Sequence, residues 1–145
     1  MAKDLFTKEQ RKQITDAIKE AELNTSGEIR VHIEKRCPED VLDRAAFWFK
    51  KLKMHKTEKR NGVLFYLAVK DRKFAIIGDA GINAVVPEGF WDNIKETMAG
   101  HFIEGEFTRG LSEGILMSGE QLKKHFPYQS DDVNELSDDI SFGNK

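Results

Sequence analysis

Four oxygen-bearing side chains are the residues of this sequence best suited to do chemistry. Glu28 opens an alternating segment, Asp79 lies between glycines in Gly78-Asp79-Ala80-Gly81, and Asn83 and Glu88 follow within ten residues. Carboxylate and amide oxygens are the ligands that Ca²⁺ and Mg²⁺ prefer in proteins. The spacing is not that of a helix-loop-helix calcium site, where the acids alternate within one loop. We therefore take Glu28, Asp79, Asn83 and Glu88 as candidate metal ligands.

Each of these residues also has a structural interpretation. Asp79 and Asn83 would satisfy the backbone amides of a turn, because Asp and Asn side chains accept hydrogen bonds there. Glu88 would favour the N-terminus of a following helix, and Glu28 would be a surface residue of a strand. Acids are common in turns, so these residues alone favour the structural interpretation.

A predicted hairpin positions Asp79. Residues 62–69 form an unbroken apolar run of strand length, rich in β-branched and aromatic residues, which is typical of a strand buried on both faces. A polar turn follows, with Asp71 and Arg72 at its tip, and a second strand begins at Phe74. Asp79 comes directly after this second strand.

A predicted βαβ unit positions Glu28. From Glu28 to Glu34, apolar and polar residues alternate, which predicts a half-exposed strand towards the edge of the sheet. Residues 37–40 begin a helix that runs to about residue 53. The first two strands should therefore be parallel, with a right-handed crossover. This topology places Glu28 and Asn61 at the starting edge of the sheet, to which the hairpin returns Asp79.

Three further helices are predicted. Thr7 and Gln10 form a capping-box pattern before an amphipathic helix. A second helix is expected from about Glu88 to Phe102, and a third follows from Phe107. The third helix contains Gly110, Gly114 and Gly119. Because glycine weakens a helix, several in one helix suggest close packing against a neighbour.

Together these elements predict an α/β fold, a three-layer α/β/α sandwich with a small mixed sheet. Residues 1–126 form the domain, and residues 127–145 form an acidic tail. We expect the tail to be largely mobile, because acids outnumber its single lysine. Four apolar residues in it are nevertheless spaced so that they would dock weakly: Val133, Leu136, Ile140 and Phe142.

Composition excludes several classes of protein. With 145 residues and a net charge of −2, the chain fits one domain without a global attraction to nucleic acid or to an anionic membrane. Its single cysteine, Cys37, allows no internal disulfide and indicates a reducing compartment. Neither an apolar leader nor a run of membrane-spanning length is visible. We expect a cytoplasmic monomer.

Most familiar catalytic and binding motifs are missing. Cys37 and Arg44 are one residue too far apart for a cysteine-phosphatase loop, and the acids between them would repel a phosphate. The histidines are scattered without the spacing of a zinc site. Neither GxGxxG nor GxxxxGK[ST] occurs. The basic run from Lys50 to Arg60 has no interleaved aromatic residues and is interpreted as a solvated helix end. Catalytic residues are not assigned.

From about residue 7 to residue 126, the chain resembles the TPM domain family, named for thylakoid-lumen and photosystem-repair proteins. The resemblance rests on a Glu opening the first strand, on the hairpin NGVLFYLAVKDRKFAIIGDAGI and on the segment FIEGEFTRGLSEGI. It implies an α/β/α sandwich that binds calcium and acts as an acid phosphatase in some members. Carried over by position, the metal ligands are Glu28, Asp79 and Glu88, with Asn83 a weaker candidate. Asn83 and Glu88 stand where the family pattern has Glu and Asp.

With the resemblance included, the predicted function is that of a domain binding Ca²⁺ or Mg²⁺, with weak metal-dependent phosphatase activity on a phosphate ester as a possible extension. A divalent ion at the edge formed by Glu28, Asp79 and Glu88 would have to activate water and hold the phosphate. Metal binding without catalysis is an equal alternative. The other alternative is a non-catalytic interaction module that recruits a protein partner through its basic helix end or its acidic tail.

Overall fold

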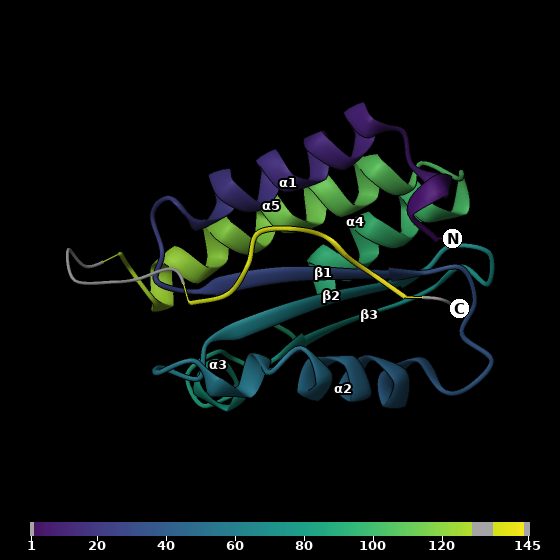
Figure 1. Cartoon of the computed structure of the whole chain (residues 1–145). Coiled ribbons are helices and arrows are strands. Elements are labelled where there is room, and N and C mark those ends of the chain that lie inside the picture. Colours follow the sequence, from purple (N-terminus) through teal and green to yellow (C-terminus); the bar gives the residue numbers. More distant parts are fainter. Residues whose placement is uncertain (1, 129–134, 144–145) are drawn as a thin grey trace.

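The computed structural model describes residues 2–128 and 135–143. Its centre is a four-stranded sheet with strand order β3-β2-β1-β4, and Figure 1 shows α1, α4 and α5 over one face and α2 under the other. β1 (Glu28–Glu34) and β2 (Gly62–Ala68) are parallel, and β3 (Lys73–Gly78) is antiparallel to β2. The predicted sandwich, with its βαβ unit and its returning hairpin strand, is therefore confirmed.

The first long helix, α1 (Lys8–Glu22), follows a short 3₁₀ helix, η1 (Ala2–Leu5). It begins with the predicted capping box, in which the Gln10 amide donates to the Thr7 hydroxyl over 3.1 Å and the Thr7 amide donates to the Gln10 side chain over 2.8 Å. The apolar stripe of α1 packs onto the apolar face of β1 in the main core, with Ile14 and Ile18 fully buried.

The prediction that β1 is half-exposed at the edge of the sheet is wrong. β1 lies between β2 and β4, and its polar residues Glu28, His32 and Glu34 are buried, at 4%, 0% and 0% exposure. The helix α2 (Val41–Lys51), capped by the Asp40 carboxylate, covers the face on which these residues lie, and the C-terminal segment covers the outer edge. Alternation in the sequence marked two chemically different faces, but both faces are covered.

The predicted helix from Glu88 to Phe102 is present but starts later, at Asp92. After β3, the one-turn helix α3 (Ala80–Asn83) is followed by turns, and α4 (Asp92–Ile103) begins only at Asp92. Gly89 adopts a φ of +78°, and the Asp92 amide donates to its carbonyl over 3.0 Å. A left-handed residue cannot continue a helix, so the helix starts after it.

The last helix, α5 (Phe107–His125), packs between α1 and α4. Its glycines face its neighbours, as predicted. Gly110 lies against Phe102, Gly114 against Met98 and Gly119 against Ala21. A side chain at any of the three would overlap an atom of the facing helix, so the glycines set how closely the helices approach.

Part of the C-terminal segment adds a fourth strand, which the sequence did not predict. β4 (Ser141–Phe142) pairs parallel with β1, and the Gly143 amide donates to the Ile33 carbonyl over 3.0 Å. Ile140 and Phe142 pack against the main core, and Leu136 packs on a smaller cluster with Met54. Of the four residues expected to dock, Val133 lies outside the described residues. Figure 1 shows this segment running alongside β1.

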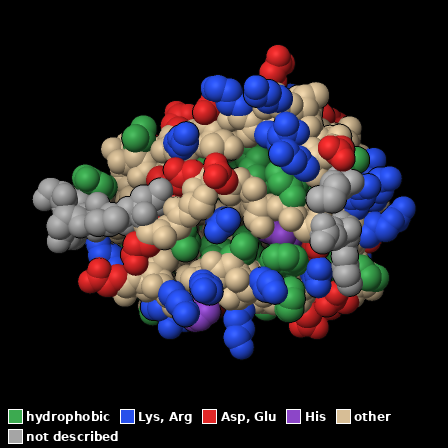
Figure 2. Space-filling model, viewed as in Figure 1, with side chains coloured by type: hydrophobic (Ala, Val, Ile, Leu, Met, Phe, Trp, Pro, Cys, Tyr) green, Lys and Arg blue, Asp and Glu red, His purple; other side chains and the backbone are tan. Residues whose placement is uncertain are grey.

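Figure 2 shows basic and acidic side chains both distributed over one face of the molecule, without a single basic patch there. The basic run predicted as a solvated helix end includes the end of α2 and the short 3₁₀ helix η2 (Met54–Lys56), where the lysines are exposed. Among the described residues, none of the helices has the length and apolarity needed to cross a bilayer.

Candidate functional site at the starting edge of the parallel strands

The register of the sheet brings Glu28 and Asp79 to the same edge. Glu28 is aligned with Gly62 at the start of β2, and the Asp79 amide donates to the Gly62 carbonyl over 3.0 Å. The two acids therefore lie on the two sides of β2, at the edge that the predicted topology assigned to them. Their side chains nevertheless have different partners.

The Glu28 carboxylate lies where the C-terminal segment reaches the domain. One of its oxygens accepts a hydrogen bond from the Leu136 amide over 2.6 Å. Burial raises the pKa of Glu28 to about 7, the Leu136 amide works against this increase, and the neighbouring Glu135 carboxylate adds to it. The raised pKa therefore favours the protonated form of this carboxyl group close to neutral pH.

A second carboxyl pair lies beside it. Glu22, at the end of α1, accepts a hydrogen bond from the Ile29 amide over 2.9 Å. Burial raises the pKa of Glu22 to about 9, and a hydrogen bond shared with Asp138 adds to the increase. Glu28 also acts on Glu22 through its charge. Acids from α1, β1 and the C-terminal segment thus meet at one place.

Sequence analysis did not identify Glu22, Glu135 and Asp138 as site residues. Glu22 looked like an ordinary polar residue of an amphipathic helix, and the other two looked like members of an acidic tail. The apolar residues Leu136, Ile140 and Phe142 were the only signal that the segment would return to the domain. Nothing in the sequence indicated which acids it would bring.

Asp79 has the structural role that the sequence left open. Its two carboxylate oxygens accept from the Arg60 guanidinium over 2.7 and 2.8 Å, and one of them accepts from the Ala80 amide over 2.7 Å as the cap of α3. Burial acts to raise the pKa of Asp79, but the hydrogen bonds from Arg60 and Ala80 outweigh it, so the pKa lies below its usual value. Arg60 occupies the oxygens that a metal ion would need.

Asn83 and Glu88 lie together, apart from Glu28. Both line a hollow of about 430 Å³ between α3 and the start of α4, which Asp92 also lines. The Asn83 side chain donates to the Gly78 carbonyl over 3.0 Å, and Glu88 is exposed. The four predicted ligands therefore fall into three groups: Glu28 with Glu135, Asp79 with Arg60, and Asn83 with Glu88.

In the part of the chain that the structure describes, no group of three or more His, Cys, Asp or Glu side chains is arranged to hold a metal ion. The carboxyl pairs at the start of β1 come closest in chemistry, since they supply only hard oxygen donors. Within the same residues, no lysine or arginine forms an ion pair with Glu22, Glu28 or Glu135.

A buried polar network lies further along β1, under α2. The Arg44 guanidinium donates to both oxygens of Glu34 over 2.8 and 2.9 Å, and the Tyr66 hydroxyl donates to Glu34 over 2.7 Å. His32 stacks on Trp48 with the ring centroids 3.7 Å apart, and its Nδ1 lies 2.8 Å from the Ser141 hydroxyl. Because every one of these contacts joins different elements, this network fastens α2 and β4 to the sheet.

Comparison with protein-family models matches residues 2–121 to the TPM domain. A search of curated proteins gives no significant match. Among solved structures, the chain is similar to the NMR structure of the BA42 protein from the psychrophilic bacterium Bizionia argentinensis, with 50% identity, 95% of each chain covered and a TM-score of 0.90.

Two more distant structures share the fold. The N-terminal domain of a protein from P. gingivalis is 21% identical, with 84% of this chain and 79% of that chain covered and a TM-score of 0.68. The N-terminal domain of the cg2496 protein from Corynebacterium glutamicum is 11% identical, with 90% and 81% covered and a TM-score of 0.68. With the family match over most of its length and the arrangement of strands and helices described above, the chain belongs to the TPM domain family.

Proposed function

We propose that this TPM domain binds a divalent cation, Ca²⁺ or Mg²⁺, at the sheet edge where β1 begins. The observation that carries the proposal is the meeting of like-charged groups, Glu28 with Glu135 and Glu22 with Asp138. Carboxylates in contact repel each other unless a proton or a cation lies between them. Glu28 and Glu135 would hold the cation, with Glu22 and Asp138 next to them.

The donor chemistry fits a hard cation, because carboxylate oxygens are the usual ligands of calcium and magnesium. Asp79 is assigned a structural role in this proposal, since Arg60 neutralises it. Asn83 and Glu88 would contribute only to a second, weaker site at their own hollow. A cytoplasmic location is part of the proposal, on the ground that the single cysteine, Cys37, allows no internal disulfide.

Hydrolysis of phosphoric monoesters is the finer proposal, and the family match supports it. A bound divalent cation supplies Lewis-acid stabilisation of a phosphoryl oxygen and a more acidic water. The residues of this chain would orient the cation through Glu28 and exclude bulk water through the C-terminal segment. The alternative is a non-catalytic interaction module, in which a protein partner binds the basic end of α2 or displaces the acidic segment.

The test is a titration of the protein with CaCl₂ and with MgCl₂, followed by amide NMR shifts. We expect saturable shifts at Glu28 and Leu136 in the wild type and in Asp79→Asn, and their loss in Glu28→Gln. Glu120→Gln, in an exposed pair with Lys123, is the matched control for removal of a carboxylate. Shifts that survive in Glu28→Gln but disappear in Asp79→Asn would move the site to Asp79, and no shifts at millimolar metal would end the proposal.

Phosphatase activity is tested separately with p-nitrophenyl phosphate. We expect turnover that requires added metal and is lost in Glu28→Gln. Metal binding without turnover would leave a regulatory or structural cation site. The absence of both metal binding and turnover would favour the interaction module.

A further inference from the structure

β3 is an outer strand of the sheet, on the side opposite to β4, and its outer edge is unpaired. β2 bonds to alternate residues along it, in the register that the bond from the Asp79 amide to the Gly62 carbonyl fixes. In an antiparallel pair, the residues between these point their amides and carbonyls away from the partner strand. They are Phe74, Ile76 and Gly78. Within the residues that the structure describes, none of their amides donates to a backbone carbonyl.

β3 has none of the usual protection of an open edge. Natural sheets protect such an edge with a bulge, a proline or an inward-pointing charge. The pairing of β3 with β2 runs without interruption from Lys73 to Gly78, so it contains no bulge. The strand contains no proline, and its one charged residue, Lys73, is its first. Its other side chains pack into the apolar cores, Phe74 and Ile76 on one face of the sheet and Ala75 on the other. An edge of this kind is suited to pair with an added strand.

The Gly78 end of the edge lies beside the hollow of about 430 Å³ between α3 and the start of α4, called here the acidic hollow. The Asn83 side chain, which lines it, donates to the outward-facing Gly78 carbonyl over 3.0 Å. A Cβ added at Gly78 would lie 3.3 Å from the ring of Trp91, which also lines it. Glu88 and Asp92 outnumber the one lysine of the lining. Among the described residues, neither acid forms an ion pair with a lysine or an arginine.

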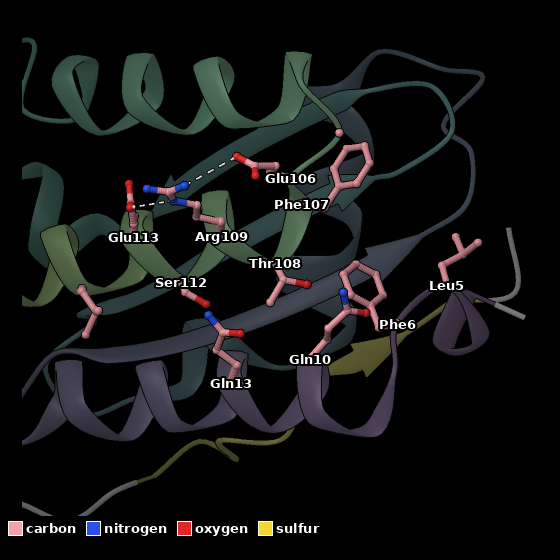
Figure 3. A pocket seen from close by; sticks show the side chains of 12 residues that line it. Leu5, Phe6, Gln10, Gln13, Glu106, Phe107, Thr108, Arg109, Ser112 and Glu113 are labelled. Atoms are coloured by element: carbon pink, nitrogen blue, oxygen red, sulfur yellow. Dashed lines mark hydrogen bonds and ion pairs between the residues drawn. The ribbon is translucent and has the colours of Figure 1, made fainter.

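The hollow between the starts of α1 and α5 differs in this respect. It is larger, about 630 Å³, but its charged residues pair with one another. Arg109 lies 3.8 Å from Glu106 and 3.3 Å from Glu113, and Figure 3 shows both contacts. The charges of that hollow are therefore already compensated, whereas the acidic hollow at the end of β3 is open to a cationic group.

The other end of the edge is basic. Arg72 and Lys73 lie where the hairpin turn leads into β3. Arg72 donates to the Ile103 carbonyl over 2.7 Å, and Lys73 donates to the Cys37 carbonyl over 2.9 Å. In the part of the chain that the structure describes, neither forms an ion pair with a carboxylate. The edge therefore carries positive charge where β3 begins and negative charge where it ends.

We propose that the outer edge of β3 binds an extended segment of a partner protein, which adds to the four-stranded sheet as a further strand antiparallel to β3. The backbone of the segment pairs with the outward amides and carbonyls of Phe74 and Ile76. Because an antiparallel segment starts beside Gly78, it begins with a lysine or arginine that faces the acidic hollow. It ends with an acid beside Lys73, and β-branched residues lie between. This inference does not depend on the cation site at Glu28.

The test uses an acetylated and amidated peptide of sequence Arg-Thr-Val-Thr-Val-Glu, titrated into the full chain without added divalent metal and followed by amide NMR. We expect saturable shifts at Phe74, Ile76 and Gly78. We expect none at Leu136, where shifts would report binding of the arginine to the acids around Glu28 instead. Such shifts at Leu136 without shifts at Phe74 and Ile76 would overturn the proposal, as would the absence of any saturable shift.

Methylated peptides test the backbone pairing. In the proposed register the amides of the two valines face β3, and those of the two threonines face away. We expect N-methylation of both valines to weaken binding more than roughly tenfold, because the methylated amides cannot donate. N-methylation of both threonines is the matched control and should leave most of the affinity. Equal affinities of the two methylated peptides would contradict strand addition.

Charge variants of the protein test the acidic hollow. We expect the double variant Glu88→Gln with Asp92→Asn to bind the unmethylated peptide roughly fivefold more weakly, since two exposed charge contacts are lost. Glu120→Gln, which removes an exposed carboxylate paired with Lys123, should leave the affinity unchanged. An unchanged affinity in the double variant would overturn the role of the hollow. Shifts at Phe74 and Ile76 that appear with increasing protein concentration alone would assign the edge to a second copy of this chain and overturn the partner segment.

Discussion

At the scale of single residues, the buried carboxylate of Glu34 depends on its partner Arg44. The Glu34 side chain is fully buried and the Arg44 side chain is 11% exposed. Burial acts to raise the pKa of Glu34, but the hydrogen bonds from Arg44 and Tyr66 outweigh it and keep the pKa below its usual value. The group is therefore ionised in the folded protein, and it needs its counter-charge.

We expect Arg44→Met to lower the free energy of unfolding by roughly 3–5 kcal/mol, because it leaves a buried charge unpaired. Urea denaturation at neutral pH measures this. Arg36→Met is the control, since Arg36 forms only an exposed pair with Asp71, and it should change the stability by less than about 1 kcal/mol. If the two substitutions changed the stability equally, the buried ion pair between Arg44 and Glu34 would not stabilise the fold as the structure indicates.

Also at the residue scale, the stability that His32 contributes depends on pH. Burial lowers the pKa of His32 to about 4, from an ordinary value of 6.5, while Glu34 acts in the opposite direction and Arg44 and Arg30 reinforce the decrease. Because the unfolded chain binds this proton more tightly, the stability that His32 contributes is complete above pH 6.5 and is lost as the pH falls towards 4.

We therefore expect the unfolding free energy of the wild type, measured relative to that of His32→Gln, to fall between about pH 6.5 and pH 4. Glu22 and Glu28, whose raised pKa values act in the opposite direction over this range, are present in both proteins and cancel in the comparison. Denaturation curves across this range measure it, and the NMR titration of the His32 ring gives its pKa directly. His125→Gln, at the end of α5, is the control for removal of a histidine. A His32 ring that titrates near 6.5 in the folded protein would contradict the burial.

At the scale of elements, the glycines of α5 allow α1 and α4 to pack closely against it. An added Cβ at Gly119 would lie 2.7–2.8 Å from atoms of Ala21, including its backbone. At Gly100, in α4, an added Cβ would meet nothing within 4 Å. The two positions are therefore a matched pair, both glycines within helices, one in contact and one free.

We expect Gly119→Ala to destabilise the protein by roughly 1–3 kcal/mol, because α1 and α5 must separate. We expect Gly100→Ala to stabilise it by roughly 0.5–1 kcal/mol, because alanine is the better helix former. Thermal and urea unfolding of the two variants decide this, and a stabilising Gly119→Ala would show that the helices pack less closely than described.

At the scale of the whole molecule, the C-terminal segment joins parts that are distant in the sequence. It pairs with β1, buries His32 beneath Ser141 and brings Glu135 and Asp138 to Glu28 and Glu22. The division into a domain at residues 1–126 and a tail at residues 127–145 remains a prediction about independent folding. The contacts of residues 135–143 with the sheet provide the means to test it.

A chain that ends at residue 134 should lose roughly 2 kcal/mol of stability, the value expected for exposing two partly buried apolar side chains, Ile140 and Phe142. The pKa of His32 should rise towards its ordinary value, because water reaches the ring. Urea denaturation and the His32 titration measure both. Ser141→Ala is the control, because it removes only the hydroxyl that lies at His32 and leaves the rest of the segment in place. Its effect shows how much of the change is due to the loss of that one hydrogen bond. Unchanged stability and an unchanged His32 pKa would show that the segment does not stay docked in solution.

Local sequence was sufficient where the chain's own neighbours decide the structure. The capping box at Thr7, the apolar run of β2 and the turn at Arg72 were predictable because each is set by residues within a few positions. The βαβ handedness and the return of β3 followed from topology rules, and these rules placed Glu28 and Asp79 at one edge. The glycines of α5 indicated close packing, although not the partner of each.

Tertiary structure alone decided which charged groups meet. Alternation in β1 predicted a solvent-facing side, but α2 and β4 cover it, because Arg44 and Ser141 come from elements that no local pattern connects to Glu34 and His32. Asp79 pairs with Arg60 and not with Glu28, since the hairpin brings Arg60 back beside it. Glu135, which approaches Glu28, arrives with a segment distant in sequence. A carboxylate's chemistry depends on what lies within a few ångströms of it, and the chain order alone does not give that distance.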